Sequence, residues 1–224
     1  MTRTRFHEGL DELKDRLLRM AGLAEQSITR AVNAFRERDG AQCRLVFESE
    51  AAINADEREI DELALDLLAM QQPMAVDLRF IVAVIKINAD LERVGDQAVN
   101  IAERVERLLT VPAVDLPIDI PLMASTAGKM IRMALEAFVL GDANLAGRVL
   151  TMDDTVDRMN HEIADVMIEL IKKSPEVTEQ ALDAIIIARN LERVGDHATN
   201  IAEDVIFWVR GADVRHHLGG ESIR

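Results

Sequence analysis

Two stretches of this chain, LERVGDQAVNIAE at residues 91–103 and LERVGDHATNIAE at residues 191–203, are nearly the same. Eleven of their thirteen positions are identical, and each copy holds a glycine among charged residues. Both copies place apolar residues three and four positions apart, which is typical of the buried face of an α-helix. The repetition indicates a fold built from two related units.

The similarity between the two halves extends beyond these stretches. A shift of 103 residues aligns the sequence before each copy and pairs Phe35 with Phe138 and Asp39 with Asp142. Between the halves, TVPAVDLPIDIPL at 110–122 holds three of the five prolines of the chain, and prolines interrupt helices. We therefore predict a first repeat at 6–109, a linker at 110–119, a second repeat at 120–211 and a flexible tail at 212–224.

Composition and apolar spacing predict an all-α fold. Hydrophobic residues make up 49% of the chain but aromatic residues only 3%, which suits helix packing better than a β-sheet. In the last helix of each repeat, apolar residues follow at alternating steps of three and four, as in helical bundles. Short breaks predict antiparallel neighbours, giving two tandem three-helix bundles related by the internal repeat. The expected helices are 6–38, 42–71 and 74–109, then 120–140, 142–172 and 176–211.

Charge and cysteine content exclude several classes of protein. The formal net charge is -14, from 40 acidic and 26 basic residues, so the mean field repels nucleic acid and anionic lipid. No run of about 18 apolar residues occurs, which argues against membrane insertion. The single cysteine, Cys43, excludes an intrachain disulfide and fits a reducing compartment, and the start of the chain lacks the apolar run of a signal peptide. We therefore expect a cytoplasmic protein that does not bind nucleic acid.

The duplicated motif also carries polar side chains on one side of its helix. At about 100° per residue, Glu92 and Asp96 lie about 100° and 140° around the axis from the core residue Leu91. Like charges four positions apart repel at a cost of about 0.3 kcal/mol, yet both copies keep them. A solvated helix face is the plain alternative, but it would be free to vary between copies. We predict an outward-facing functional stripe of Glu92, Asp96, Asn100 and Glu103, repeated as Glu192, Asp196, Asn200 and Glu203.

The middle helix of each repeat carries a related pair. Asp153 and Asp157 lie four residues apart, with His161 one turn further, and the shift of 103 places Glu50 and Asn54 at the corresponding positions. Carboxylates at this spacing can surround one hard cation such as Mg²⁺ or Mn²⁺, and asparagine adds a neutral oxygen ligand. The candidate metal ligands are Glu92, Asp96, Asn100, Glu192, Asp196, Asn200, Asp153, Asp157, Glu50 and Asn54.

Gly95 and Gly195 lie in the middle of the predicted third helices. Glycine there costs about 1 kcal/mol relative to alanine. Its presence in both copies favours close approach of a neighbouring helix over a tolerated weakness. We therefore expect another helix to pack closely at both positions.

These features resemble the PhoU family, the accessory regulators of the high-affinity phosphate-specific transporter. The resemblance rests on a tandem three-helix unit whose third helix bears an ERxGDxAxNIAE-like stretch, here Glu92–Glu103 and Glu192–Glu203, and it extends from about Phe6 to Arg210. It implies an all-α cytoplasmic protein, often dimeric, that represses the phosphate-starvation response. It also implies two partners, the ATPase subunit of the phosphate transporter and a phosphate-sensing histidine kinase.

Some members of that family bind multinuclear iron or zinc on the bundle surface through E(D)xxxD motifs. In this chain the residue four positions after Glu50 is Asn54 and not an acid, so one motif departs from the family pattern. The resemblance implies metal binding by the other three motifs, which are Glu92 with Asp96, Glu192 with Asp196, and Asp153 with Asp157.

Three functions remain in view. The main prediction is a non-enzymatic negative regulator of phosphate uptake and phosphate-starvation signalling that docks on protein partners. The alternative is a di-metal carboxylate enzyme in a helical bundle, although that class uses a Glu-x-x-His motif and no histidine here has a glutamate three residues before it. A purely structural bundle would tolerate neutral residues in place of the acidic ones.

Overall fold

The computed structural model of the protein describes residues 3–71 and 73–211, and this part of the chain is helical without strands. The all-α prediction is therefore confirmed, while the predicted tail at 212–224 lies outside the described residues. None of the described helices is long and apolar enough to cross a membrane. The elements are α1 (Arg3–Glu37), α2 (Gly40–Gln71), α3 (Val76–Leu109), α4 (Ile120–Leu140), α5 (Ala143–Leu150), α6 (Asp153–Lys173), a 3-10 turn η1 (Pro175–Val177) and α7 (Thr178–Arg210).

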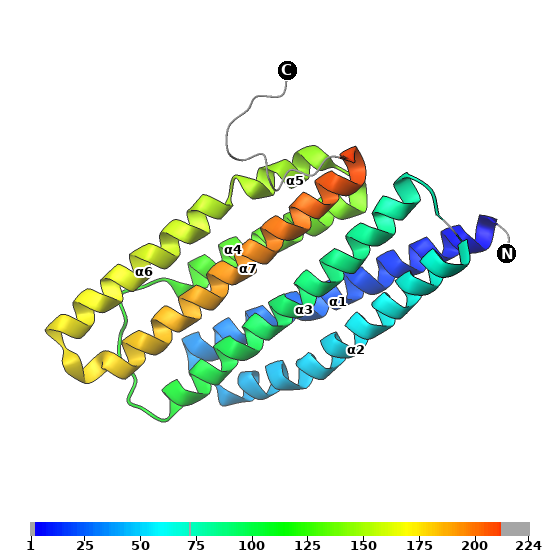
Figure 1. Cartoon of the computed structure of the whole chain (residues 1–224). Helices are drawn as coiled ribbons and strands as arrows, with labels where there is room; N and C mark the ends of the chain where they lie inside the picture. The colour runs from blue at the N-terminus through cyan, green and yellow to red at the C-terminus, as the bar shows by residue number, and fades with distance from the viewer. Residues whose placement is uncertain (1–2, 72, 212–224) are drawn as a thin grey trace, which may run out of the picture.

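The helices form two three-helix bundles that lie side by side (Figure 1). In the first, α1, α2 and α3 pack against one another. In the second, α5 and α6 together take the place of α2 and pack with α4 against α7. α3 and α7 run antiparallel through the middle, with Arg79 near Trp208 at one end and Arg104 near Asp183 at the other. The two predicted tandem bundles are confirmed, and α3 and α7 form the interface between them.

The middle element of the second repeat is broken, whereas we expected a single helix at 142–172. α5 ends where the Thr151 hydroxyl donates to the carbonyl of Arg148 at 2.8 Å. Asp153 opens α6, and acidic side chains are favourable at a helix N-terminus. In the first repeat Ser49 donates to a carbonyl one turn back, at 2.7 Å, inside a continuous α2. The predicted single helix at 142–172 is therefore wrong, because the chain divides between α5 and α6 at Thr151 and Met152.

One hydrophobic core runs through both repeats. The apolar residues at alternating steps of three and four form the predicted seam of each last helix, and all of them are buried except Trp208, which is half-buried. The seam comprises Val84, Ile87, Leu91, Val94, Ala98, Ile101, Val105 and Leu108 on α3, and Ala184, Ile187, Leu191, Val194, Ala198, Ile201, Val205 and Trp208 on α7. Phe80 of α3, Phe138 of α4 and Trp208 of α7 meet with ring centroids 5.2 to 5.6 Å apart. Such aromatic contacts add to the burial of apolar area, and here they join helices of different repeats. The predicted linker 110–119 contains no helix, so the repeats are held together by this core.

Gly95 and Gly195 lie where the third helix of each repeat faces the middle helix of the same repeat. A Cβ atom added at Gly95 would lie 3.0 Å from Cδ1 of Ile53 on α2. At Gly195 it would lie 3.4 Å from Cγ1 of Val156 on α6. The predicted close approach is therefore confirmed at Gly95, whereas a Cβ at Gly195 would make only an ordinary van der Waals contact. The packing of these helices brings the acidic motifs of α2 and α3, and those of α6 and α7, into the same grooves.

Candidate functional site

Three aspartates converge in the groove between α6 and α7. Asp153 and Asp157 lie one turn apart on α6, and Asp196 faces them from α7. One carboxylate oxygen of each lies within 4.8 Å of the other two. The Thr199 hydroxyl donates to Oδ1 of Asp153 at 3.2 Å and ties that carboxylate to α7. Three of the ligands predicted in the second repeat are therefore brought together.

Burial and like charge make this group unfavourable without a counter-ion. Burial raises the pKa of Asp153, and the carboxylate of Asp157 raises it further. The pKa of Asp196 is raised by the same two causes in the same order. A divalent cation among these oxygens would remove the repulsion, since it supplies the opposite charge that the three carboxylates lack.

Glu192 is a fourth carboxylate close to Asp196 and Asp157, and it is more deeply buried than the three aspartates. The residue is 9% exposed, and its Oε1 accepts a hydrogen bond from Arg189 at 2.8 Å. Its Oε2 is buried and has no hydrogen-bond partner among the described residues, which is costly for a carboxylate. Burial raises the pKa of Glu192, and Asp196 raises it further. Carboxylates and a hydroxyl without a thiolate are a donor set that fits a hard cation such as Mg²⁺ or Mn²⁺.

The first repeat holds a matching acidic group between α2 and α3, with one member that sequence reasoning missed. Burial raises the pKa of Glu92, and the carboxylates of Asp96 and Glu57 raise it further, with a smaller effect from Glu50. Glu57 lies one turn after Asn54 on α2 and so supplies the second acid that Asn54 does not. Within the described residues, three carboxylates converge within 4.8 Å only in the second repeat.

The two grooves carry the same residue types in a different order. Each middle helix contributes two acids and one asparagine to its groove, spread over two turns of one face. The asparagine and the second acid have exchanged places between the repeats. Glu57 lies seven residues, or two helical turns, after Glu50 and therefore on the same face of the helix. The sequence prediction missed it because it considered only residues four positions apart. The shift of 103 pairs Glu50, Asn54 and Glu57 with Asp153, Asp157 and Asn160.

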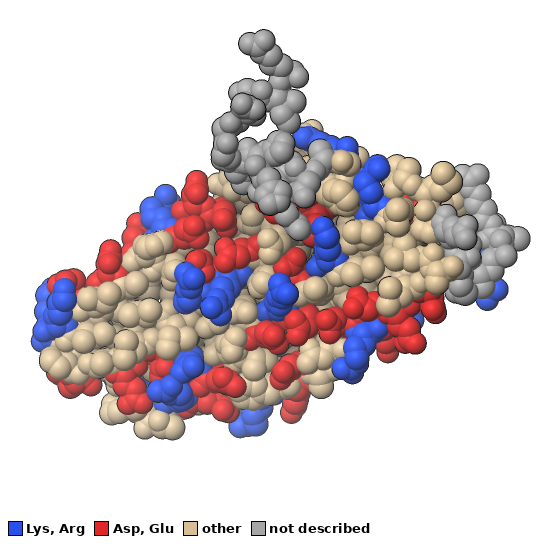
Figure 2. All heavy atoms as spheres, in the orientation of Figure 1, with Lys and Arg blue, Asp and Glu red and all other residues tan. Residues whose placement is uncertain are grey.

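The acidic stripe is only partly outward-facing, whereas the prediction placed all of it on an outward face. Glu192 is buried and Glu92 is half-buried, while Asp196 and Glu103 are exposed as predicted. Figure 2 shows acidic side chains along the boundary of α2 and α3, and a smaller group between α6 and α7. The prediction was wrong for Glu92 and Glu192 because it assigned one inward direction to each helix, whereas α3 and α7 each pack against several neighbours.

Asn100 and Asn200 point to a different part of the structure. The Asn200 amide donates to Oδ1 of Asp90 on α3 at 3.1 Å, and Nδ1 of His197 lies 2.9 Å from the same oxygen. Asn100 lines a groove together with residues of α7. Both positions lie about 180° from the core residue of the motif, on the side of the α3–α7 interface. The structure therefore separates them from the carboxylates with which they were predicted to share a cation.

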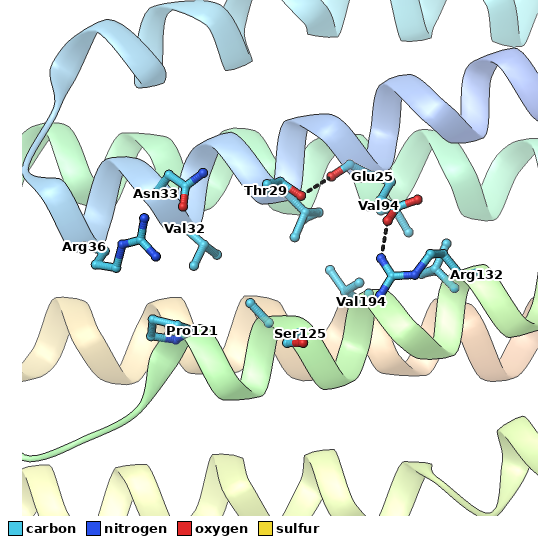
Figure 3. Close-up of a pocket in the computed structure, with 14 residues that line it drawn as sticks. Glu25, Thr29, Val32, Asn33, Arg36, Val94, Pro121, Ser125, Arg132 and Val194 are labelled. Carbon is cyan, nitrogen blue, oxygen red and sulfur yellow. Dashed lines mark hydrogen bonds and ion pairs between the residues drawn. The ribbon is translucent and has the colours of Figure 1, made fainter.

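A cavity of about 280 Å³ opens elsewhere, between α1 and α4 (Figure 3). Val94 and Val194, the same position in the two motif copies, are among its lining residues. Arg132 of α4 forms an ion pair with Glu25 of α1 at this cavity. None of the predicted metal ligands lines it, so it is a feature separate from the acidic grooves.

Both halves of the chain match one family of known proteins. The family model described as PhoU domain matches residues 17–105 and 120–205. A protein of Pseudomonas aeruginosa named phosphate-specific transport system accessory protein PhoU homolog is 39% identical over 94% of this chain and 88% of its own length. A protein of Thermotoga maritima with the same name, homolog 1, is 34% identical over 96% of this chain and 93% of its own.

Solved structures show the same fold. The crystal structure of PhoU from Pseudomonas aeruginosa has a TM-score of 0.89 at 38% sequence identity and covers 92% of this chain and 100% of its own. The phosphate transport system regulatory protein PhoU from Streptococcus pneumoniae has a TM-score of 0.85 at 27% identity, over 93% of this chain and 99% of its own. The likeness therefore spans both repeats.

Proposed function

This chain belongs to the PhoU family, and from that premise we propose that it is a negative regulator of phosphate uptake and of phosphate-starvation signalling. The observation that carries the proposal is the similarity, across both repeats, to proteins named accessory proteins of the phosphate-specific transport system. Similarity over nearly the whole chain includes the core and both acidic grooves, so a role in phosphate transport applies to the protein as a whole.

In this proposal the protein acts by docking. It serves as a cytoplasmic, homodimeric adaptor between the ATPase subunit of the phosphate ABC transporter and a phosphate-sensing histidine kinase. The accessory role named for its relatives supports association with a transport system. A net charge of -14 favours partner surfaces that are basic, because complementary potentials steer association.

The acidic grooves are proposed as metal sites. Convergent carboxylates, raised pKa values and the buried Oε2 of Glu192 support a cation in the second repeat. Oxygen ligands favour Mg²⁺ or Mn²⁺ by ligand type, and iron or zinc is implied by the family resemblance. Bound there, a cation supplies charge compensation and a link between two helices. The residues that would hold it are Asp153, Asp157, Glu192 and Asp196 in one groove, and Glu50, Glu57, Glu92 and Asp96 in the other.

A non-enzymatic role fits the geometry better than the di-metal enzyme. Such enzymes gather glutamates and two Glu-x-x-His motifs from four helices around one bundle centre. Here the carboxylates occupy two separate grooves, each formed by two helices. His161, the histidine on α6, has its Nδ1 2.8 Å from the backbone carbonyl of Asp157. The arrangement supports a regulator with structural or sensing cations.

Deletion of the gene tests the regulatory proposal. In phosphate-rich medium the deletion should raise phosphate uptake and alkaline phosphatase output, and the wild-type gene should restore both to low levels. A pull-down at high phosphate should recover the transporter ATPase subunit with the protein. Unaltered uptake and phosphatase output in rich and poor phosphate, in a strain without a second family member, would contradict the proposal.

A further inference from the structure

A basic groove lies between α3 and α7 of this strongly acidic protein. It has a volume of about 340 Å³ and its walls include three arginines, Arg104, Arg189 and Arg193, with the amides of Asn100 and Asn190. No carboxylate is among its lining residues. Figure 2 shows basic side chains gathered over α7 on the face that presents both helices. The groove is therefore a local exception to the net charge of -14.

The arginines differ in how they are held. Arg189 donates to the buried Glu192 at 2.8 Å, and Arg104 lies 3.8 Å from the buried Asp183. Arg193 is exposed, and none of the described residues forms a hydrogen bond or ion pair with it. A guanidinium has five N–H donors, so one carboxylate contact orders an arginine and leaves donors for a ligand. The groove thus holds two arginines in contact with a carboxylate and a third, Arg193, that only lowers the pKa of Glu192 and Asp196 by its charge without contacting either carboxylate.

The internal repeat supplies a comparison within the same molecule. The equivalent positions in the other half include two acids, and both have partners there. Asp204 lies 3.2 Å from Lys86, and Asp90 lies 2.9 Å from His197. Arg93 is the exposed counterpart of Arg193. The two motif copies lie 100 residues apart, so the positions of Arg104, Arg189 and Asn190 are taken in the other half by Asp204, Ala89 and Asp90.

This difference shows that the helix pair does not require a basic groove. The same backbone arrangement accepts acidic, internally paired side chains on one side and three arginines on the other. The buried carboxylates of Glu192 and Asp183 account for the positions of Arg189 and Arg104. They do not account for Arg193, which lines the same groove with no carboxylate among its walls, and a ligand of opposite charge does account for that.

We propose that this groove binds a small oxyanion of the phosphate type. Guanidinium groups match the oxygens of a phosphate in a bidentate manner, and amide groups add neutral donors. The mean field of the protein repels anions, so binding needs the arginines concentrated at this one place. The volume admits orthophosphate with bound water or the phosphate group of a small phosphomonoester. The inference concerns binding by the isolated protein and does not depend on the proposed regulatory function.

Calorimetric titration of the purified, untagged protein tests the inference. One arm uses orthophosphate and a second uses phenyl phosphate, both at low ionic strength. Saturable binding of one anion per chain is expected, with a Kd on the order of 1 mM or tighter. Arg193→Gln should weaken it about tenfold, the factor expected for loss of a charge-assisted hydrogen bond. Arg93→Gln is the matched control, since it removes the same exposed side chain from the other motif copy, and should change the Kd less than about twofold.

Each outcome of the titration decides the inference. Tighter binding of orthophosphate supports free phosphate as the ligand, and tighter binding of phenyl phosphate supports a phosphorylated metabolite. No saturable binding of either anion would overturn the inference, and so would equal weakening by R193Q and R93Q. Far-ultraviolet circular dichroism should show the same helical content in both variants, whose substituted side chains are exposed.

Discussion

Arg189 donates a hydrogen bond to Glu192, three residues later on α7, at 2.8 Å, and this pair separates two regions of opposite charge. On one side lies the basic groove, and on the other lies the acidic group of α6 and α7. The pKa of Glu192 reflects both, because burial and Asp196 raise it while Arg189 lowers it. A ligand in either region therefore changes the charge environment of the other.

We expect cation and anion binding to be coupled through this pair. A divalent cation neutralises the carboxylates and binds Glu192 as a ligand. This weakens the hydrogen bond from Arg189 to Glu192, so the guanidinium of Arg189 can donate to an anion. Saturating Mg²⁺ should tighten orthophosphate binding about threefold, and orthophosphate should tighten Mg²⁺ binding by the same factor, as linkage requires. Titrations of each ligand with and without the other measure both factors. Factors that differ, or weaker anion binding in Mg²⁺, would contradict the coupling.

The raised pKa values predict an unusual dependence of stability on pH. Glu192 and Asp196 have pKa values above their ordinary 4.5 and 3.8, chiefly through burial. Between the ordinary and the raised values, the folded protein binds more protons than the unfolded chain, so stability falls as pH rises through the folded-state pKa. In excess chelator, the urea midpoint should therefore increase as the pH is lowered from neutrality through the raised folded-state pKa values towards the ordinary carboxylate pKa.

Asp196→Asn provides the control for this pH dependence. It removes one carboxylate with a raised pKa and relieves repulsion of Asp157, so it should flatten the curve and raise the midpoint at neutral pH. The same rise and slope in wild type and variant would show that Asp196 is not responsible. A midpoint that falls on acidification would contradict the assignment of raised pKa values altogether.

The exchanged positions of asparagine and acid between the repeats predict that the first groove can bind a cation with either order of these residues on α2. Glu57→Asn should weaken cation binding in that groove, because it leaves α2 with one acid there. Adding Asn54→Asp to this variant gives α2 the order acid, acid, asparagine that Asp153, Asp157 and Asn160 have in the second repeat. It should restore the cation affinity to within about twofold of wild type, since the number and charge of the ligands are regained. Calorimetric titration with Mn²⁺ measures each variant. If Glu57→Asn binds as wild type does, Glu57 is not a ligand.

The glycines predict three different effects of alanine on the free energy of unfolding. Gly22 on α1 has no heavy atom within 4 Å of an added Cβ, so Gly22→Ala should stabilise by about 1 kcal/mol. At Gly95 the added Cβ would lie 3.0 Å from Ile53, and overpacking should make the net effect destabilising by about 1 kcal/mol. At Gly195 the nearest contact of 3.4 Å is ordinary, so alanine should be neutral or stabilising. Urea unfolding ranks the three variants, and a stabilising Gly95→Ala would contradict the close approach.

The seam of each third helix was predictable from sequence because burial follows a regular period. From Val84 to Leu108 every predicted core position is buried, and Gly95 correctly predicted a close helix approach. The orientation of the polar side chains was not predictable in the same way. Periodicity gives the angle between side chains on one helix, but the neighbour that each side chain meets depends on packing. Glu92 therefore faces α2, while Asn100 faces α7.

The break between α5 and α6 and the full set of acids in the first groove also could not be predicted from the apolar periodicity or from the internal repeat. A single predicted helix at 142–172 divides at Thr151, whose hydroxyl bonds to the preceding turn. Glu57 was missed because the two repeats do not preserve the order of acid and asparagine, only the face on which they lie. Both features depend on contacts between side chains and their surroundings, which similarity between two halves of a sequence does not reveal.

The most direct test of the account is the number of cations that each groove holds. Native mass spectrometry of the untagged protein equilibrated with Mn²⁺ should show at least one bound ion per repeat. Asp157→Asn should remove the ion of the second repeat, whereas Asp165→Asn, an exposed change on the same helix, should leave the count unchanged. An unchanged count in Asp157→Asn, with the helical content of wild type, would contradict the claim that the acidic grooves bind metal ions.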